Sequence, residues 1–109
     1  MITLTGRLIC ADSAEAEIVR RYLDRHSELT RAEPGCLHFC VAETDDPLVW
    51  EVSERFVDRP AFDAHQHRVR ASEWGRVTAA IARDYAISET RPAAVEVIRA
   101  APLGTRMTV

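Results

Sequence analysis

A glutamate and a histidine, Glu54 and His65, are the strongest candidates for acid–base chemistry in this sequence. Glu54 shares one side of an alternating apolar segment with Trp50 and Phe56, and a carboxylate in such surroundings has a raised pKa unless it is paired. The imidazole of His65 titrates near neutral pH, so it could accept a phenolic proton or stabilise a developing oxyanion. Glu54 could orient that imidazole, as a carboxylate does in hydrolytic triads. The alternatives are a structural histidine and a buried ion pair between Glu54 and an arginine of a second subunit.

A second candidate cluster, Cys36, His38 and Cys40, occupies alternate positions of one expected strand. Alternate side chains of a strand share a face and lie roughly 6.6–7 Å apart, so they converge on a metal ion only with help from elsewhere. Cys10, on a neighbouring expected strand, is the candidate fourth ligand. Buried thiols are also common as small apolar groups. We therefore expect no metal site, and we regard His38 as a second candidate proton acceptor that faces a ligand cavity.

Aromatic and cationic side chains could complete a site for a flat substrate. The aromatic candidates for its walls, each also a natural core residue, are Trp50, Trp74, Tyr85, Phe39 and Phe56. Arg55 and Arg7 could hold a substrate oxyanion, or they could pair with Glu51 or Glu54. The chain has four glycines, and it contains no glycine-rich phosphate loop, no metal-binding carboxylate motif and no Gly-x-Ser-x-Gly motif. The sequence thus predicts no cofactor.

The first half of the chain predicts a strand, a long helix and a hairpin. Residues 2–11 alternate in polarity, which is typical of a strand. Asp12 or Ser13 can cap the helix that follows, whose apolar residues recur at helical spacing and which ends before Pro34-Gly35. Two further strands are expected at 36–43 and 49–57, joined by a turn at 44–47.

The second half predicts two helices and a final strand. Asp58 can cap a short helix that has Pro60 in its first turn and carries His65. Ser72 can cap another helix, on which one apolar stripe is expected to comprise Trp74, Val77, Ile81 and Tyr85. We then expect a connector at 86–92, a strand at 93–98 and a tail at 101–109.

This order of elements predicts an α+β, ferredoxin-like split βαβ fold with a four-stranded antiparallel sheet covered by helices on one face. One domain is expected at 1–100, with the tail at 101–109 outside it. The strands offer apolar or bulky groups to both faces, and a bare apolar face does not stay wet in a water-soluble protein. Face-to-face homodimerisation, which closes two sheets into an α/β barrel, would cover it.

Composition narrows the function and the compartment. The chain has 109 residues, and its charges are mixed in sign with a net charge of -3, so there is no basic field for nucleic acid. No apolar run approaches the ~20 residues of a membrane span. Three cysteines, an odd number, argue against a secreted disulfide framework, and the cytoplasm is the expected compartment.

Several short motifs together resemble the antibiotic biosynthesis monooxygenase family. They are Glu33-Pro34-Gly35-Cys36, Phe39, the pair Glu54 and Phe56, and the pair Phe62 and His65, in that order. Phe56 is a mild departure, because such proteins more often have Trp or Tyr there. The resemblance implies a homodimeric ferredoxin-like domain, and it settles the fold better than the reaction.

The resemblance also implies an activity: cofactor-independent oxidation of an electron-rich phenol, quinol or anthrone-type compound to a quinone with O2. Haem-degrading relatives use an Asn on the first strand and a Trp on the short helix, whereas this chain has no Asn and has His65 at the Trp position. We therefore expect no haem. The small aromatic substrate and O2 are the expected ligands, and a non-catalytic small-molecule binder or stress-associated protein on the same fold is the alternative.

Overall fold

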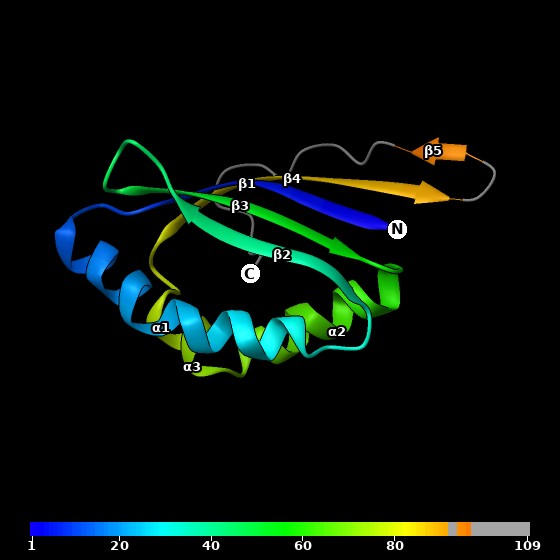
Figure 1. Ribbon diagram of the computed structural model, residues 1–109, viewed down its shortest axis with the longest axis horizontal. Helices are drawn as coiled ribbons and strands as arrows, with labels where there is room; N and C mark the ends of the chain where they lie inside the picture. The colour runs from blue at the N-terminus through cyan, green and yellow to red at the C-terminus, as the bar shows by residue number, and fades with distance from the viewer. Residues whose placement is uncertain (92–93, 97–109) are drawn as a thin grey trace.

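The structure is a computed structural model that describes residues 1–91 and 94–96. It has an α+β ferredoxin-like fold in which antiparallel strands form one layer and the helices form the other (Figure 1). The strands are β1 (Ile2–Ile9), β2 (Cys36–Glu43), β3 (Val49–Phe56), β4 (Ala82–Arg91) and the short β5 (Ala94–Glu96), and the helices are α1 (Ser13–Arg31), α2 (Arg59–Arg70) and α3 (Glu73–Val77). The strand order is β2-β3-β1-β4-β5, so the expected four-stranded sheet is extended by β5 at its β4 edge.

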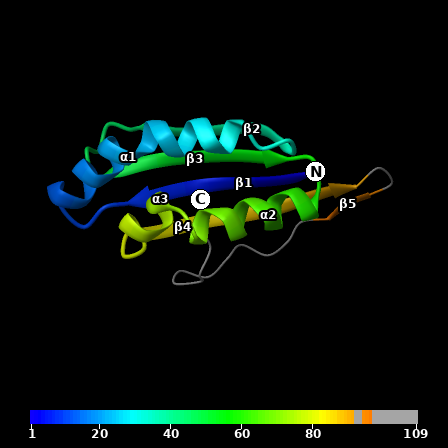
Figure 2. The ribbon, with the colours of Figure 1, turned by 90° about the horizontal axis from the view of Figure 1, so that it is seen from below.

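Side-chain caps start the helices where the sequence predicts them. Asp12 accepts the backbone N–H of Glu15 at 2.9 Å, and Asp58 accepts that of Ala61 at 2.8 Å. Ser72 accepts the N–H of Gly75 at 3.1 Å. Each cap satisfies one of the backbone donors that a helix leaves open at its first turn. Figure 2 shows α1 lying across the β2–β3 half of the sheet and α2 along the β1–β4 half.

The core lies between the sheet and the helices. Strand β1 places Ile2, Leu4 and Leu8 on this covered face, all at most 1% exposed. In the register of the sheet, Leu4 lies opposite Glu54 on one side and Ile87 on the other. The covered face is therefore apolar around one carboxylate. Among the described residues, no helix is long and apolar enough to span a membrane.

The helix predicted from Ser72 to Tyr85 is wrong beyond its first turns, because α3 ends at Val77. Thr78 stops it by donating its hydroxyl to the carbonyl of Trp74 at 2.6 Å, and Arg83 donates to the carbonyls of Thr78 and Ile81 at 2.8 and 3.0 Å. Residues 82–91 instead form β4, so the described part of the connector expected at 86–92 is a strand, and residue 92 lies outside the described residues. The strand expected at 93–98 is described only as β5, and the tail at 101–109 lies outside the described residues.

A β-bulge at Leu37 separates two residues that the sequence pattern placed on one face. Cys36 pairs with Phe56, whereas His38 pairs with Arg55, so the register shifts by one residue between them. Because neighbouring positions of a strand face opposite ways, Cys36 lies on the covered face while His38 and Cys40 lie on the bare one. The proposed ligand set of Cys36, His38 and Cys40 is therefore split by the sheet.

Gly6 allows β4 to approach β1 closely beside Tyr85. Its φ of 157° is one that other residues rarely adopt, and a β-carbon there would collide with the Asp84 carbonyl and lie 2.7 Å from the Tyr85 ring. Glycine thus gives the buried ring of Tyr85 its place on the covered face, next to the strand that carries Leu4.

Candidate active site

His65 is held from one side by a carboxylate that the sequence places in a turn. Its Nδ1 lies 2.8 Å from Oε1 of Glu33, which follows α1. The same oxygen accepts two hydrogen bonds from Arg68, at 2.8 Å from Nη2 and 3.1 Å from Nε. Arg68 also donates to the hydroxyl of the buried Thr30 at 3.0 Å. An ionised carboxylate only accepts hydrogen bonds, so Nδ1 of His65 is the donor in this contact.

The opposite nitrogen of His65 faces Glu54 across the core. Nε2 lies 3.8 Å from Oε1 of Glu54, too far for a hydrogen bond, and both side chains are 0% exposed. Neither Nε2 nor either carboxylate oxygen has a hydrogen-bond partner among the described residues. The expected pair is thus close in space, but the orienting hydrogen bond comes from Glu33 rather than from Glu54. Glu33 belongs to the Glu33-Pro34-Gly35-Cys36 motif, yet nothing in the local sequence pattern pairs it with a residue on α2.

The environment moves the two pKa values in opposite directions. Burial, with a smaller contribution from the charge of Glu33, raises the pKa of Glu54 well above 4.5, and Arg83 only partly offsets this. Burial also lowers the pKa of His65 below 6.5, against the opposing effect of its hydrogen bond to Glu33. Both shifts favour the uncharged forms, since burial penalises charge. Burial therefore moves both members of the pair toward their uncharged forms, a carboxylic acid facing an imidazole.

Aromatic rings surround the imidazole of His65. Phe56 of β3 lies 4.8 Å away between ring centroids, and Phe39 of β2 lies 6.3 Å away. His26 of α1 lies 6.2 Å away and stacks on Trp74 of α3, with centroids 4.5 Å apart and planes 2° from parallel. Four elements thus contribute flat side chains to one apolar wall.

His26 is the residue of this wall that the sequence reasoning missed. It is 2% exposed, and the buried positions of α1 are Ala16, Val19, His26, Ser27 and Thr30. Leu29, one of the apolar residues at helical spacing that predict this helix, is instead 37% exposed. The spacing of seven residues between Val19 and His26, two helical turns, is the signal that could have placed the histidine inward.

Tyr85 and Trp50, two of the expected wall residues, also lie on the covered face of the sheet. Tyr85 is 3% exposed, and burial raises the pKa of its phenol. Trp50 is four residues from Glu54 along β3, roughly 13 Å away in an extended strand. Its ring instead lies 5.9 Å from the guanidinium of Arg20. Trp50 is therefore at the far end of the core, and we drop it from the site around His65.

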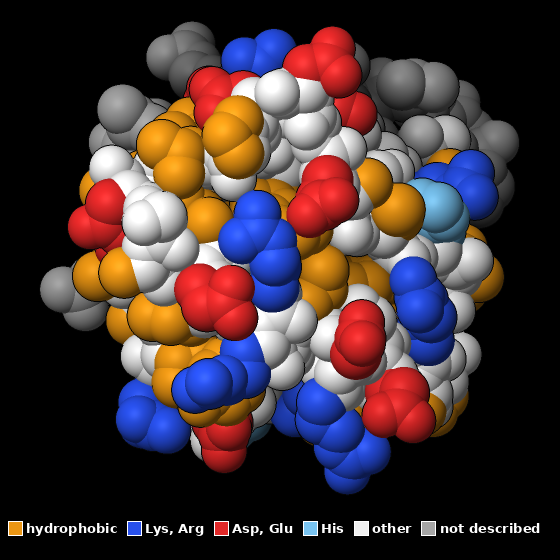
Figure 3. Space-filling model, turned by 60° about the vertical axis from the view of Figure 1, so that its left-hand side comes forward, with side chains coloured by type: hydrophobic (Ala, Val, Ile, Leu, Met, Phe, Trp, Pro, Cys, Tyr) orange, Lys and Arg blue, Asp and Glu red, His pale blue; other side chains and the backbone are white. Residues whose placement is uncertain are grey.

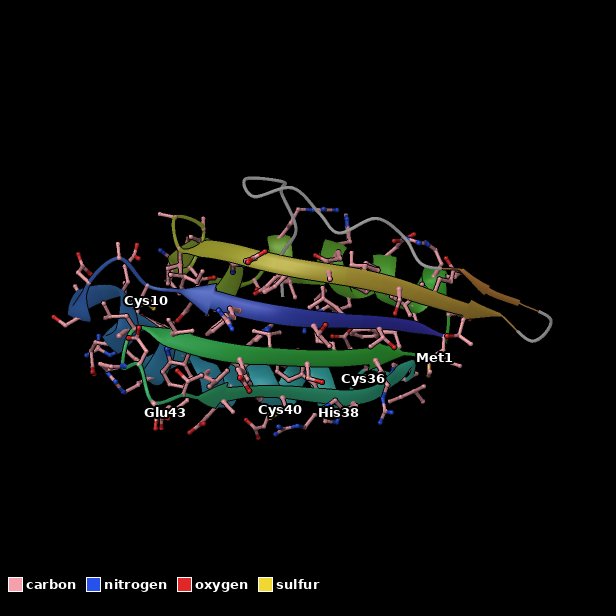
Figure 4. All side chains as sticks on the ribbon, turned by 90° about the horizontal axis from the view of Figure 1, so that it is seen from above. Met1, Cys10, Cys36, His38, Cys40 and Glu43 are labelled. Carbon is pink, nitrogen blue, oxygen red and sulfur yellow. The ribbon has the colours of Figure 1, made fainter. Side chains whose placement is uncertain are left out.

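His38 and Arg55 are placed away from His65, on the bare face of the sheet. They pair across β2 and β3, and Arg55 is exposed. Figure 4 looks onto this face and shows His38 and Cys40 along β2, with Cys10 at the opposite end of the molecule from Cys36. The bare face also holds a depression of about 360 Å³, lined by Thr5, Gly6, Arg7, Cys40, Ala42, Glu51, Val52 and Ser53.

The surface around these features carries both signs of charge. In Figure 3, acidic and basic side chains alternate over the visible face, with apolar groups between them. The structure also has exposed ion pairs, such as Arg25 with Glu28 at 3.5 Å. The visible face offers no broad basic field to a polyanion.

Comparisons with known proteins agree with this architecture. Residues 1–76 match the family model described as antibiotic biosynthesis monooxygenase. A Nitrosomonas europaea protein named for that family has a solved structure similar to this one, with a TM-score of 0.68 and 19% identity over 83% of this chain and 98% of its own. A Mycobacterium tuberculosis protein gives 0.64 and 22% over 83% and 94%, and a Pseudomonas aeruginosa protein gives 0.61 and 24% over 79% and 87%. The search of curated proteins finds no match.

Proposed function

Because the chain belongs to the antibiotic biosynthesis monooxygenase family, we propose that it is a cofactor-independent monooxygenase. Its proposed substrate is an electron-rich phenol, quinol or anthrone-type compound, which it oxidises to a quinone with O2. The observation that carries this proposal is the buried pair of His65 and Glu54, whose pKa values are shifted in opposite directions. Two titratable groups treated so differently by their surroundings are typical of an acid and a base in one site.

The proposed reaction needs a proton acceptor but no metal. Removal of a proton from the substrate gives an anion that can transfer one electron to O2, which leaves a substrate radical and superoxide. Recombination of these two forms a carbon–oxygen bond, and protonation gives a hydroperoxide. Loss of water from the hydroperoxide then leaves the quinone carbonyl, so one oxygen atom enters the product and the other leaves as water.

The two site residues can divide this work. The neutral imidazole of His65, with the lone pair of Nε2 free of any described partner, is the base that accepts the substrate proton. The carboxyl of Glu54, 3.8 Å away and with a pKa raised by burial, is the proposed acid that supplies a proton when water leaves. A dry surrounding strengthens both interactions, and the rings of Phe56, Phe39 and Trp74 provide it.

Arg83 replaces Arg55 as the candidate partner for a substrate anion. It projects from β4 on the covered side, and its charge acts on both Glu54 and Tyr85. Its Nη atoms bond Thr78 and Ile81, while its buried Nε has no hydrogen-bond partner among the described residues. A cation so placed would stabilise a phenolate or a developing peroxide.

Homodimerisation through the bare face and a cytoplasmic location complete the proposal. The sheet face opposite the helices carries a depression of about 360 Å³ that a second copy would cover. All three cysteines are free thiols, as suits a reducing compartment. Sedimentation of the full chain at micromolar concentration tests the dimer, and a monomer would contradict it.

Oxygen uptake with metal-stripped protein tests the activity. The substrates should be a panel of hydroquinones and anthrones, with quinone formation followed by absorbance in parallel. We expect uptake of one O2 per quinone formed and an activity that survives chelation. Absence of turnover across the panel would favour the second candidate, a non-catalytic small-molecule binder. The observation that favours that candidate is the complete burial of His65 and Glu54, since a substrate must reach them.

A further inference from the structure

Glu33 accepts more hydrogen bonds than the one from His65. Three N–H groups converge on its Oε1: one from His65 and two from Arg68. The side chain of Glu33 is 17% exposed and that of Arg68 31%, whereas His65 is fully buried. The cluster therefore joins the surface to the imidazole, and it ties the end of α1 to α2 through the bond between Arg68 and Thr30.

We propose that Glu33 and Arg68 are positioning residues that together set the tautomer and the charge of His65. Glu33 accepts a hydrogen bond from Nδ1–H, which fixes the tautomer whose Nε2 carries only a lone pair, on the side of Glu54. Arg68 offsets the negative charge of Glu33, so that the hydrogen bond orients the ring without drawing a second proton onto it. This inference deepens the proposed function and rests on it for its kinetic consequence, whereas the tautomer is a property of the resting protein.

Charge balance explains why both residues are needed. A lone carboxylate beside an imidazole favours the protonated ring, which has no lone pair to accept a proton. Glu33 does act in this direction on the pKa of His65, and Arg68 acts in the opposite direction. Burial then leaves the ring neutral as well as oriented.

The other charged or titratable groups that face the imidazole do not compete for Nδ1. Glu54 of β3 lies on the Nε2 side, and His26 of α1 lies 6.2 Å from the ring centroid. Arg83 and Tyr85 of β4 are linked to Glu54 rather than to His65. Glu33 is therefore the acceptor on which the tautomer depends.

Long-range ¹H–¹⁵N spectra of the ¹⁵N-labelled full chain test the inference directly. At a pH where the ring is neutral, we expect a protonated, pyrrole-like Nδ1 and a bare, pyridine-like Nε2 for His65. His67, exposed on the same helix, should show the averaged tautomers of a solvated ring and serves as the internal reference. A wild-type His65 that carries its proton on Nε2, or averages like His67, would overturn the proposal without any variant.

Three substitutions then separate the two residues. Glu33→Gln keeps an oxygen acceptor, so the tautomer should persist, while the pKa of His65 falls. Glu33→Met removes the acceptor at similar size, so Nε2–H should appear. Arg68→Gln keeps a donor for Glu33 but removes the charge, so the tautomer should persist while the pKa of His65 rises. If all three leave the tautomer and the pKa of His65 unchanged, the cluster is a structural tie alone.

Kinetics distinguish this inference from the proposed function. For turnover of any active panel substrate, Glu33→Met should lower kcat by on the order of 10²-fold, with Glu33→Gln restoring most of it. Arg68→Gln should move the acid limb of the pH profile to higher pH. Glu28→Gln, in an exposed pair with Arg25, is the matched control and should change neither the spectrum nor kcat. Expected spectra without turnover would refute the function alone, and turnover with an Nε2–H histidine would refute the inference alone.

Discussion

The two faces of the sheet treat similar residues in opposite ways. His65 and Glu54 meet on the covered face with 0% exposure, whereas His38 and Arg55 meet on the bare face in contact with solvent. On the covered side, burial raises the pKa of Glu54 and lowers that of His65, and both shifts favour the uncharged form. The face therefore decides the surroundings: a histidine beside a charged residue type is driven toward its uncharged form only where water is removed.

Strand β3 makes the comparison within two adjacent residues. Glu54 points into the core opposite Leu4, and Arg55 points outward opposite Thr3. One is an acidic and the other a basic residue, yet alternation of the strand puts their side chains on opposite faces of the sheet. The bare face is also more polar than the sequence pattern suggested, with Thr5, Arg7 and Glu51 exposed on it.

The largest expected effect comes from replacing the covered histidine. His65→Ala should lower kcat by roughly 10²–10⁴-fold, the range for loss of a general base. It should also cost about 1–3 kcal/mol of unfolding free energy, because Glu33 loses a buried donor. The measurements are quinone formation at substrate saturation and chemical denaturation. His67→Ala, on the exposed side of the same helix, should change neither quantity. Full activity in the His65 variant would leave the covered face without its base.

The sequence predicts those features of the two faces that depend on residues close together in the chain. The caps at Asp12, Asp58 and Ser72 and the inward side of β1 depend on neighbours within a few residues. The fold and the proximity of His65 to Glu54 followed from the same order of elements together with the family motifs. Patterns of period 2 and 3.6 are visible in any single chain.

The rest depended on contacts between distant segments. Glu33 reaches His65 over 32 residues of sequence, and no spacing rule links a turn to a later helix. The bulge at Leu37 separates Cys36 from the face that His38 and Cys40 share, although the sequence gives no sign of an inserted residue. Ile81 and Tyr85 continued the helical spacing of Trp74, but Arg83 and Thr78 close α3 and the chain continues as β4.

A substitution at Gly6 in β1 should lower the stability of the fold without lowering kcat. Gly6→Ala forces a β-carbon against the Asp84 carbonyl and the Tyr85 ring at a φ of 157°, so it should cost about 2–4 kcal/mol. Urea denaturation measures this cost as a lower midpoint with an unchanged slope. Because Gly6 touches neither His65 nor Glu54, kcat should be retained at a temperature where the variant is folded. An unchanged midpoint would show that β1 and β4 relax around the methyl group.

The covered carboxyl should give a smaller effect with a defined pH dependence. The pKa of Glu54 is raised above 4.5 in the folded chain, so the folded state holds the proton more tightly than the unfolded state does. That contribution is complete below pH 4.5 and is lost as pH rises through the folded pKa. Glu54→Gln removes the loss, and it should raise stability at pH 7 by on the order of 1 kcal/mol.

Denaturation of both proteins between pH 4 and pH 8 measures that difference. His65, whose lowered pKa makes stability fall below pH 6.5, is present in both proteins, so its contribution largely cancels in the comparison. The amide of the variant also cannot act as an acid, so quinone release should slow while the first O2-dependent step persists. A stability difference that is constant with pH would show that folding leaves the pKa of Glu54 unchanged, which would contradict the raised pKa.

The smallest expected effect is on the bare face. His38→Ala should change stability by less than about 0.5 kcal/mol and kcat by less than about 2-fold, because His38 lies opposite the exposed Arg55 in the strand register, on the other side of the sheet from His65. If a second copy covers this face, the substitution should instead change the dimer dissociation constant, which sedimentation measures. Comparison with His65→Ala then tests the central contrast with one residue type. A loss of kcat from His38→Ala equal to that from His65→Ala would mean that the reacting atoms lie on the bare face. The base would then have to be sought around the depression that Cys40, Arg7 and Glu51 line there.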